Sequence, residues 1–244
     1  MEMQEFLDQL EQTIFRYDLL QHPFYQAWSR GELALEDLRE SARGYYHQVE
    51  SFPDYLLRFA ARLERGDVRA AGLANLRDEV GGSTRRSHSD LWLAFVEGMG
   101  AERPLAGHKP SSQIFDLVLF FEQMAKQGSR EEVLAASMPT NRKCRECRGK
   151  NGEDLLRNTA QASAPVVISS SIPLPMSTTP GSGSAQLEKH LRAHPERSYA
   201  ALKAAEAAAR ALWRALDGIE VRSFGRLKRV APSATLAGSN ELPR

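Results

Sequence analysis

Apolar residues recur at helical spacing through the first half of the chain. Between positions 35 and 63 they follow steps of three and four residues almost without interruption, which indicates one long helix with a single apolar stripe. Pro53 falls inside this stripe and predicts a kink, because proline removes one backbone donor and crowds the preceding turn. The stripe consists of Leu35, Leu38, Ala42, Tyr45, Val49, Phe52, Leu56, Phe59 and Leu63.

Shorter stripes of the same period predict further helices. The last one, from Tyr199 to Leu216, is rich in alanine and amphipathic, and Gly218 is placed to cap it. No segment alternates apolar and polar residues for long enough to predict a strand, so the predicted fold class is all-α. Other helices are expected over residues 6–15, 91–96 and 114–124, the last of them ending near Gly128. One more helix is expected to end with residues 75–80.

The stretch from 137 to 185 breaks this pattern. Up to residue 184 it has no Phe, Trp or Tyr, it holds both cysteines, and its second half is dominated by Ser, Thr, Pro and Gly. Such a composition buries too little apolar surface to offset the entropy lost on ordering. We therefore expect one helical domain over residues 1–220, a disrupted or disordered segment at about 137–185, and a flexible tail at 221–244.

Charge and composition narrow the class of protein. The 32 Lys and Arg residues nearly cancel the 31 Asp and Glu residues, so bulk charge gives no reason to expect nucleic acid or an anionic membrane as a partner. No apolar run approaches the roughly 20 residues of a membrane span, and the acidic N-terminus differs from a signal peptide. Two cysteines do not make a disulfide framework. We expect a soluble, cytoplasmic protein.

Several strings, taken in order, resemble one family. They are HPFYQAW at 22–28, ARGYYHQVESFPDYL at 42–56, NLRDEVGG at 75–82, HSDLWLAFVEGMG at 88–100 and YAALKAAEAAARALWRALDGIE at 199–220. The set is similar to the haem-oxygenase-like metal oxidases, the family of the chlamydial death-domain-associating protein and of PQQ synthase. The resemblance implies a seven-helix bundle. Several members bind two metal ions, usually iron, through carboxylates and histidines on facing helices.

The resemblance also implies roles for individual residues. Glu79 and His88 match the first pair of metal ligands, but the nine positions between them are two more than the usual spacing, so the connecting loop must bulge or the helix must break differently. Tyr25 matches the tyrosine that the chlamydial relative is thought to consume as the source of p-aminobenzoate, which makes it the candidate catalytic residue. Tyr45 and His47 lie where the family lines its cavity; the apolar stripe favours a core position for Tyr45 and leaves His47 open.

Two further ligand strings of the family are missing from the printed chain. They are a Tyr-Ala-Tyr-Glu-like string and a His-x-x-x-Asp-x-x-His string, and both belong where the chain loses its aromatic residues. Both strings can be sought in a shifted reading frame, in which each codon consists of the third base of one codon and the first two bases of the next. In this frame the genetic code permits Leu-Tyr-Ala-Tyr-Glu over the codons of residues 136–141. The same shift permits Phe-His-x-x-x-Asp-Val-x-His at 170–179. The sequence therefore predicts a pair of compensating frameshifts flanking residues 137–185, with a true insertion as the alternative.

Together these features predict an oxygen-dependent, di-iron oxidoreductase of cofactor biosynthesis, of the p-aminobenzoate and folate type. Its cofactor is iron, its partners are a small-molecule substrate and dioxygen, and a homodimer is left open. One alternative is a metal-free oxidase like PQQ synthase, whose cavity needs several Arg and His residues for a polycarboxylate. Another is a non-catalytic helical interaction protein, because the second-half ligands are missing.

Overall fold

The computed structural model describes residues 1–83, 85–101, 107–139 and 182–219. These residues form α-helices, two short 3-10 helices and one isolated bridge, without a strand among them, which confirms the all-α prediction. Two of the α-helices have only seven residues, and the others have between 11 and 28. The α-helices are α1 (Met3–Arg16), α2 (Pro23–Ser29), α3 (Leu35–Arg62), α4 (Asp67–Val80), α5 (His88–Gly98), α6 (Ser112–Gln127), α7 (Arg130–Ala136), α10 (Ser182–Ala193) and α11 (Ser198–Asp217).

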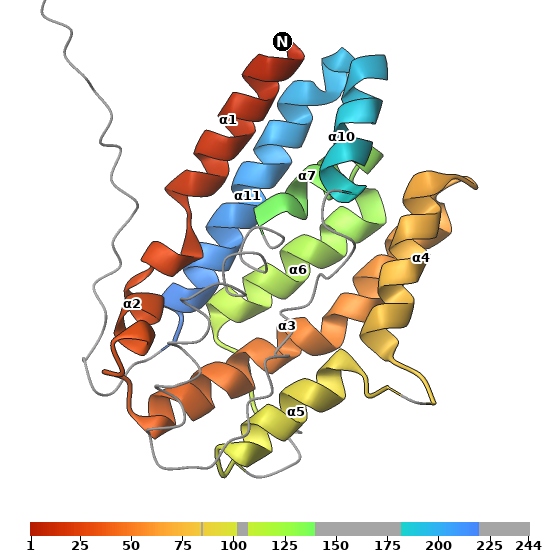
Figure 1. Ribbon diagram of the computed structural model, residues 1–244. Coiled ribbons are helices and arrows are strands. Elements are labelled where there is room, and N and C mark those ends of the chain that lie inside the picture. Colours follow the sequence, from red (N-terminus) through yellow and green to blue (C-terminus); the bar gives the residue numbers. More distant parts are fainter. Residues whose placement is uncertain (84, 102–106, 140–181, 220–244) are drawn as a thin grey trace, which may run out of the picture.

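The helices form two groups that share α6 (Figure 1). In one group the long α3 packs against α4 and α5, and in the other α11 packs against α1 and α7. Helix α6 contacts both α3 and α11 and so joins the two groups. Helix α3 continues through Pro53 to Arg62 as one element, so proline does not end it.

The helix ends follow local sequence signals. Ser87, Ser111 and Ser129 each accept a backbone N–H in the first turn of the helix that follows them, which satisfies a donor without an intrahelical partner. Gly128 and Gly218 follow the last residues of α6 and α11, as predicted. At Gly218 the cause is space: a Cβ there would lie 2.7 Å from the Ser111 hydroxyl oxygen. Glycine therefore lets the end of α11 approach the start of α6.

The buried apolar residues form two clusters. The larger one fills the space between α2, α3, α5, α6 and the second half of α11. A smaller cluster joins α1, α7 and α10 to the first half of α11, with Phe6 and Leu191 among its members. Alanines dominate the buried face of α11, and their small side chains allow neighbouring helices to approach closely.

Two predictions concern residues outside the described part of the chain. The segment predicted to be disrupted or out of frame lies almost wholly within residues 140–181, and the predicted tail lies within 220–244. The described chain stops three residues after α7 and resumes at the start of α10. The single-domain boundary therefore stays a prediction.

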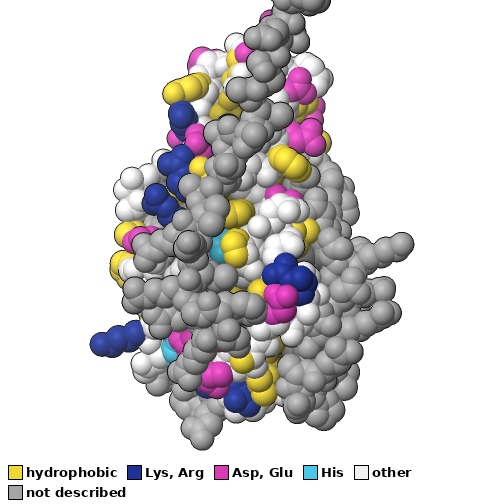
Figure 2. All heavy atoms as spheres, turned by 90° about the vertical axis from the view of Figure 1, so that its left-hand side faces the viewer, with side chains coloured by type: hydrophobic (Ala, Val, Ile, Leu, Met, Phe, Trp, Pro, Cys, Tyr) yellow, Lys and Arg dark blue, Asp and Glu magenta, His cyan; other side chains and the backbone are white. Residues whose placement is uncertain are grey.

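Among the described residues, no helix is long and apolar enough to cross a membrane. Basic and acidic side chains are interspersed on the face shown in Figure 2.

Candidate functional site

Glu79 and His88 meet inside the helical bundle, at the junction of α4 and α5. The Glu79 side chain is fully buried and the His88 side chain is 9% exposed. Nδ1 of His88 contacts Oε2 of Glu79 directly. The structure thus brings together the two residues that the family resemblance pairs, and both face inward.

The loop between α4 and α5 absorbs the long spacing of this pair. Gly81 has a φ of +70°, and a Cβ there would lie 2.4 Å from the carbonyl oxygen of Arg85, so only glycine fits. Gly82 and Arg85 then pair through two backbone hydrogen bonds of 2.8 and 3.3 Å. The Arg85 guanidinium also donates to the carboxylate of Asp78 at 3.0 Å, which fastens the loop to the end of α4. The predicted bulge is this tight turn, and it returns His88 to Glu79.

The pair is chemically incomplete. Oε1 of Glu79 is buried and has no hydrogen-bond partner among the described residues. Burying an unpaired carboxylate oxygen is unfavourable, and a carboxylate beside an imidazole is a donor set that ferrous iron accepts. The two residues therefore fit a metal ion. Within the described ranges, however, no group of three or more His, Cys, Asp and Glu side chains is arranged to hold one.

Helix α5 connects this pair to a cavity. His88 and Trp92 are four positions apart and Phe95 is three further on, so the three share one face of the helix. All three are buried. The Trp92 indole donates a hydrogen bond of 2.8 Å to the carbonyl oxygen of Ala42, which fixes this face of α5 on α3.

A small cavity lies beyond Trp92, between α2, α3, α5 and the end of α11. Its volume is about 40 Å³, enough for a few molecules the size of water. Aromatic rings make up much of its wall, and the polar groups among the described lining side chains are hydroxyls and the indoles of Trp28 and Trp92. The lining residues are Phe24, Tyr25, Trp28, Leu38, Ser41, Ala42, Tyr45, Trp92, Phe95, Leu216 and Ile219.

Tyr25, the candidate catalytic residue, belongs to this cavity. Its ring stacks on Trp28 with centroids 5.8 Å apart and meets Phe24 edge-on at 5.7 Å. Only 8% of the residue is exposed. His88 shares one face of α5 with Trp92 and Phe95, and the latter two line the cavity together with Tyr25.

The other residues singled out on α3 divide between two places. Tyr45 packs its ring on Trp92 at 5.4 Å and lines the cavity. His47 instead pairs with His108, with Nε2 and Nδ1 3.3 Å apart, and Nε2 of His108 lies 3.1 Å from a carboxylate oxygen of Glu40. Burial and the neighbouring His108 lower the pKa of His47, against the opposing effect of Glu50. His47 is therefore part of a His–His–Glu chain and does not line the cavity.

A second histidine–carboxylate pair, with a buried histidine and a half-buried aspartate, was missed by sequence reasoning. His22 is 1% exposed, and its Nδ1 accepts the backbone N–H of Phe24 at 3.1 Å. Its Nε2 lies 3.3 Å from Oδ1 of Asp217, 195 positions away. Since Nδ1 is an acceptor, the neutral ring carries its proton on Nε2 and donates it to Asp217. A histidine directly before a proline at a helix start was the available signal.

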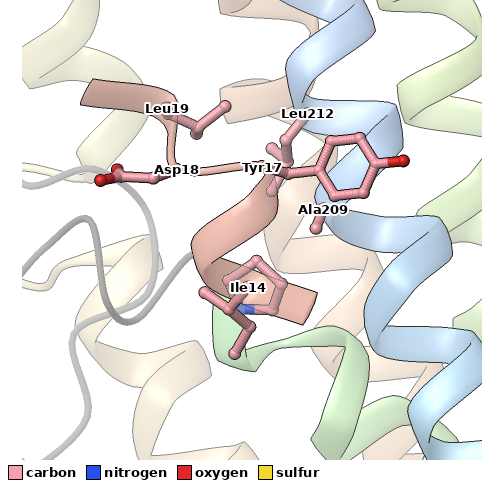
Figure 3. Close-up of a pocket in the computed structure, with 7 residues that line it drawn as sticks. Ile14, Tyr17, Asp18, Leu19, Ala209 and Leu212 are labelled. Carbon is pink, nitrogen blue, oxygen red and sulfur yellow. The ribbon is translucent and has the colours of Figure 1, made fainter. Parts of the chain in front are cut away.

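A second hollow lies beside α1 and α11 (Figure 3). Its volume is about 10 Å³, room for one water molecule at most. Tyr17 and Asp18 are among the residues that line it, and no histidine or glutamate is. Figure 3 shows the Asp18 carboxylate and the Tyr17 hydroxyl pointing in different directions, so the two groups do not converge. This hollow is not a candidate reaction site.

Comparison with known proteins places this geometry in a family. The family model described as iron-containing redox enzyme matches residues 39–174, which is more than half of the chain. The match includes Glu79 and His88 and leaves out Tyr25. It also runs through residues 140–174, which lie outside the described part of the chain.

Curated relatives match over a shorter length. A 4-aminobenzoate synthase of Chlamydia muridarum is 41% identical over 107 residues, which is 43% of this chain and 44% of the relative. A 4-aminobenzoate synthase of Chlamydia pneumoniae is 35% identical over 50% of this chain and 54% of its own. One from Nitrosomonas europaea is 38% identical over 40% of this chain and 42% of its own. The matches thus span about half of these relatives or less.

A solved structure confirms the fold. A TenA homologue from Pseudomonas syringae pv. tomato superposes with a TM-score of 0.60, covering 88% of this chain and 91% of its own. Its sequence identity of 13% supports the fold alone. Because the family match covers more than half of the chain and contains both members of the buried Glu79–His88 pair, this chain belongs to the iron-containing redox enzyme family, within the haem-oxygenase-like fold.

Proposed function

We propose that this chain is an oxygen-dependent, di-iron oxidoreductase of cofactor biosynthesis that forms 4-aminobenzoate. Its curated relatives carry the name 4-aminobenzoate synthase. The observation that carries the proposal is the buried Glu79–His88 contact with one carboxylate oxygen left unpaired, on the same face of α5 as the cavity of Tyr25. In this proposal Glu79 and His88 hold iron, and Tyr25 is the catalytic residue.

When bound, the iron supplies the activation of dioxygen. The residues of the chain provide the surroundings. Ring contacts with Trp28 and Phe24 hold Tyr25 in one orientation at the cavity wall. The lining of the cavity is mostly apolar, and the Tyr25 ring forms part of its wall. This supports a reaction in which the oxidised ring, that of Tyr25, belongs to the protein.

The cavity also bears on the metal-free alternative. An oxidase that resembles PQQ synthase needs cationic side chains to hold a polycarboxylate. Among the described residues, those that line this cavity include neither arginine nor histidine. The iron-dependent reaction is therefore the better-supported function.

The proposal is tested by following the origin of the product. The full chain is produced with ¹³C-labelled tyrosine, supplied with ferrous iron, a reductant and oxygen, and the small molecules are identified by mass spectrometry. We expect labelled 4-aminobenzoate from the protein whose reading frame is restored between codons 136 and 185, and none from its Tyr25→Phe variant. The matched control is Tyr45→Phe, because Tyr45 lines the same cavity and keeps its ring contact with Trp92.

Two results would contradict the proposal. Unlabelled product would show that the ring does not come from the protein, and undiminished product from Tyr25→Phe would remove the role of that residue. Glu79→Gln supplies the test of the metal ligand. Product formation should fall at least about a hundredfold in this variant, since the loss of a charged oxygen donor weakens metal binding.

A further inference from the structure

Asn75 carries a second unpaired oxygen in the region of the metal-ligand pair. The residue is 4% exposed, and its Oδ1 has no hydrogen-bond partner among the described residues. Glu79 Oε1 is in the same condition one helical turn further along α4. Buried side-chain oxygens are normally paired, so two neighbouring exceptions need a common explanation.

Both residues belong to the face of α4 that turns into the bundle. Asn75 and Glu79 are four positions apart, which places their Cβ atoms about 5–6 Å from one another on one side of a helix. With Val68 they are the buried residues of α4. At Gly72, on the same stripe, an added Cβ would lie 3.8 Å from the Cβ of Ala60 on α3. The stripe therefore faces α3 closely, and Val68, Asn75 and Glu79 on it are buried.

The chemistry of the two oxygens indicates what they lack. A carboxamide oxygen and a carboxylate oxygen are both acceptors, so neither satisfies the other. His88 already uses its Nδ1 on the other oxygen of Glu79. A cation, or a water molecule held by one, would satisfy both acceptors at once. Hard oxygen donors of this kind are suitable neighbours for ferrous iron.

We propose that Asn75 belongs to the metal site, with its carboxamide oxygen facing the ion at Glu79 and His88, either directly or through a water bound to it. This inference rests on the proposed function, because it takes the Glu79–His88 pair as the place of the iron. It adds a neutral oxygen ligand to a site that would otherwise have one carboxylate and one imidazole from this half of the molecule. Asn75 is then kept for metal binding at the expense of stability.

The test is Asn75→Leu in the full chain, with the melting temperature measured without metal and again at millimolar ferrous iron under anaerobic conditions. Without metal, the variant should melt on the order of 2–4 °C higher, because an unpaired buried acceptor is replaced by an apolar group. With iron, its gain in melting temperature should be smaller than that of the starting protein. The iron dissociation constant should rise about tenfold.

Two further variants separate this role from a structural one. Asn75→Asp should melt lower without metal, because two carboxylates then lie close together, and should gain more on adding iron. The control is Gln48→Leu, which removes a buried carboxamide whose oxygen has a partner, the Tyr55 hydroxyl at 3.4 Å. It should lower the melting temperature without metal and leave the gain with iron unchanged.

The outcomes distinguish this inference from the proposed function. If Asn75→Leu behaves like Gln48→Leu, Asn75 is structural and the inference is wrong. If Glu79→Gln loses the gain with iron while Asn75→Leu keeps it, the metal site stands and Asn75 is not part of it. If the starting protein gains nothing from iron, the site at Glu79 and His88 fails, and the inference fails with it.

Discussion

Two pairs of a buried histidine and a carboxylate lie in this bundle, and they differ in how completely they are bonded. In the pair of His22 and Asp217, both ring nitrogens have partners, and the pair joins α2 to the end of α11. In the pair of Glu79 and His88, one carboxylate oxygen has none, and the pair joins two consecutive helices. Under the proposed function, the fully bonded pair supports the fold and the incomplete pair is the proposed place of the metal ion.

The difference teaches how to separate structural from functional polar groups in a core. A fully bonded pair contributes stability, and breaking it leaves a buried charge or donor without a partner. An incomplete pair reduces stability in the metal-free protein and gains it back on binding. Mutations at the two places should therefore act in opposite directions on the metal-free protein.

The largest expected effect comes from completing the incomplete pair. Restoring the alternative frame between codons 136 and 185 would add a Glu and a helix with His, Asp and His at steps of four and three. These three residues lie on one helix face and can converge with Glu79 and His88 on a metal site. We expect the restored protein to bind about two iron ions. It should also gain helicity and thermal stability, because a Ser-, Thr- and Pro-rich stretch is replaced by a helix with aromatic residues. The printed chain should bind iron only weakly.

Metal analysis, circular dichroism and melting curves of the two proteins test this expectation. Equal iron content and equal melting temperature would contradict both the frameshift and the di-iron site. Sequencing the gene across codons 130–190 gives an independent answer, since an unbroken frame there would favour a true insertion.

The next largest effect concerns the bonded pair. His22→Ala removes the acceptor for the Phe24 N–H and the donor to Asp217, and should destabilise the protein by about 2–3 kcal/mol. His22→Asn is the matched control, because asparagine can still cap α2 and cannot reach Asp217. It should recover roughly half of the loss. Urea unfolding measures both, and a loss below about 0.5 kcal/mol for His22→Ala would show that the pair is not structural.

A smaller effect on the metal-free stability is expected when the carboxylate of either pair is replaced by a neutral amide, and its sign should differ between Asp217 and Glu79. Asp217→Asn should lower the free energy of unfolding by about 1 kcal/mol, since an amide oxygen still accepts from His22 more weakly than a carboxylate. Glu79→Gln should leave the metal-free stability unchanged or raise it, because a buried charge is removed. Thermal melting without metal compares the two variants. If Glu79→Gln lowered the stability as much as Asp217→Asn, the two pairs would not differ in the way described.

The smallest effect concerns pH. The pKa of His47 is lowered in the folded protein, first by burial and then by His108, and burial followed by Arg130 lowers that of His190. The unfolded chain then takes up protons first, so stability is lost as pH falls from the ordinary histidine value of 6.5 through the folded pKa. Melting curves between about pH 8 and pH 5 should show this decline, and His47→Gln should flatten it. A decline of the same steepness in His47→Gln would show that another group causes it.

The pattern of apolar residues predicted the fold class and most helices, because buried stripes of period 3.6 are a local property of the sequence. The ends of α6 and α11 were predicted from Gly128 and Gly218 for the same reason. That Glu79 and His88 would be close followed only from the resemblance. The sequence could not show how Gly81 folds the extra residues into a turn, because this depends on the backbone of Arg85 across the loop.

Contacts between distant segments were beyond sequence reasoning. His22 and Asp217 are 195 positions apart, and His47 and His108 are 61 apart, so nothing in either neighbourhood identifies the partner. The sequence could in principle have indicated Asn75 as a neighbour of Glu79, because it lies one helical turn before it. Its unpaired oxygen, which makes it a candidate, exists only in the packed structure.

The contact between His22 and Asp217 also bears on the order in which parts of the protein can form during synthesis. A growing chain emerges from the ribosome at about 5–20 residues per second, so α4 and α5 can bring Glu79 and His88 together well before α11 is made. The α2 segment with Tyr25, by contrast, has no Asp217 to hold it until almost all of the described chain is complete. Leu216 and Ile219, which wall the cavity beside Tyr25, arrive in the same last stretch. During synthesis, the contact between Glu79 and His88 can therefore form first, and the cavity beside Tyr25 closes last.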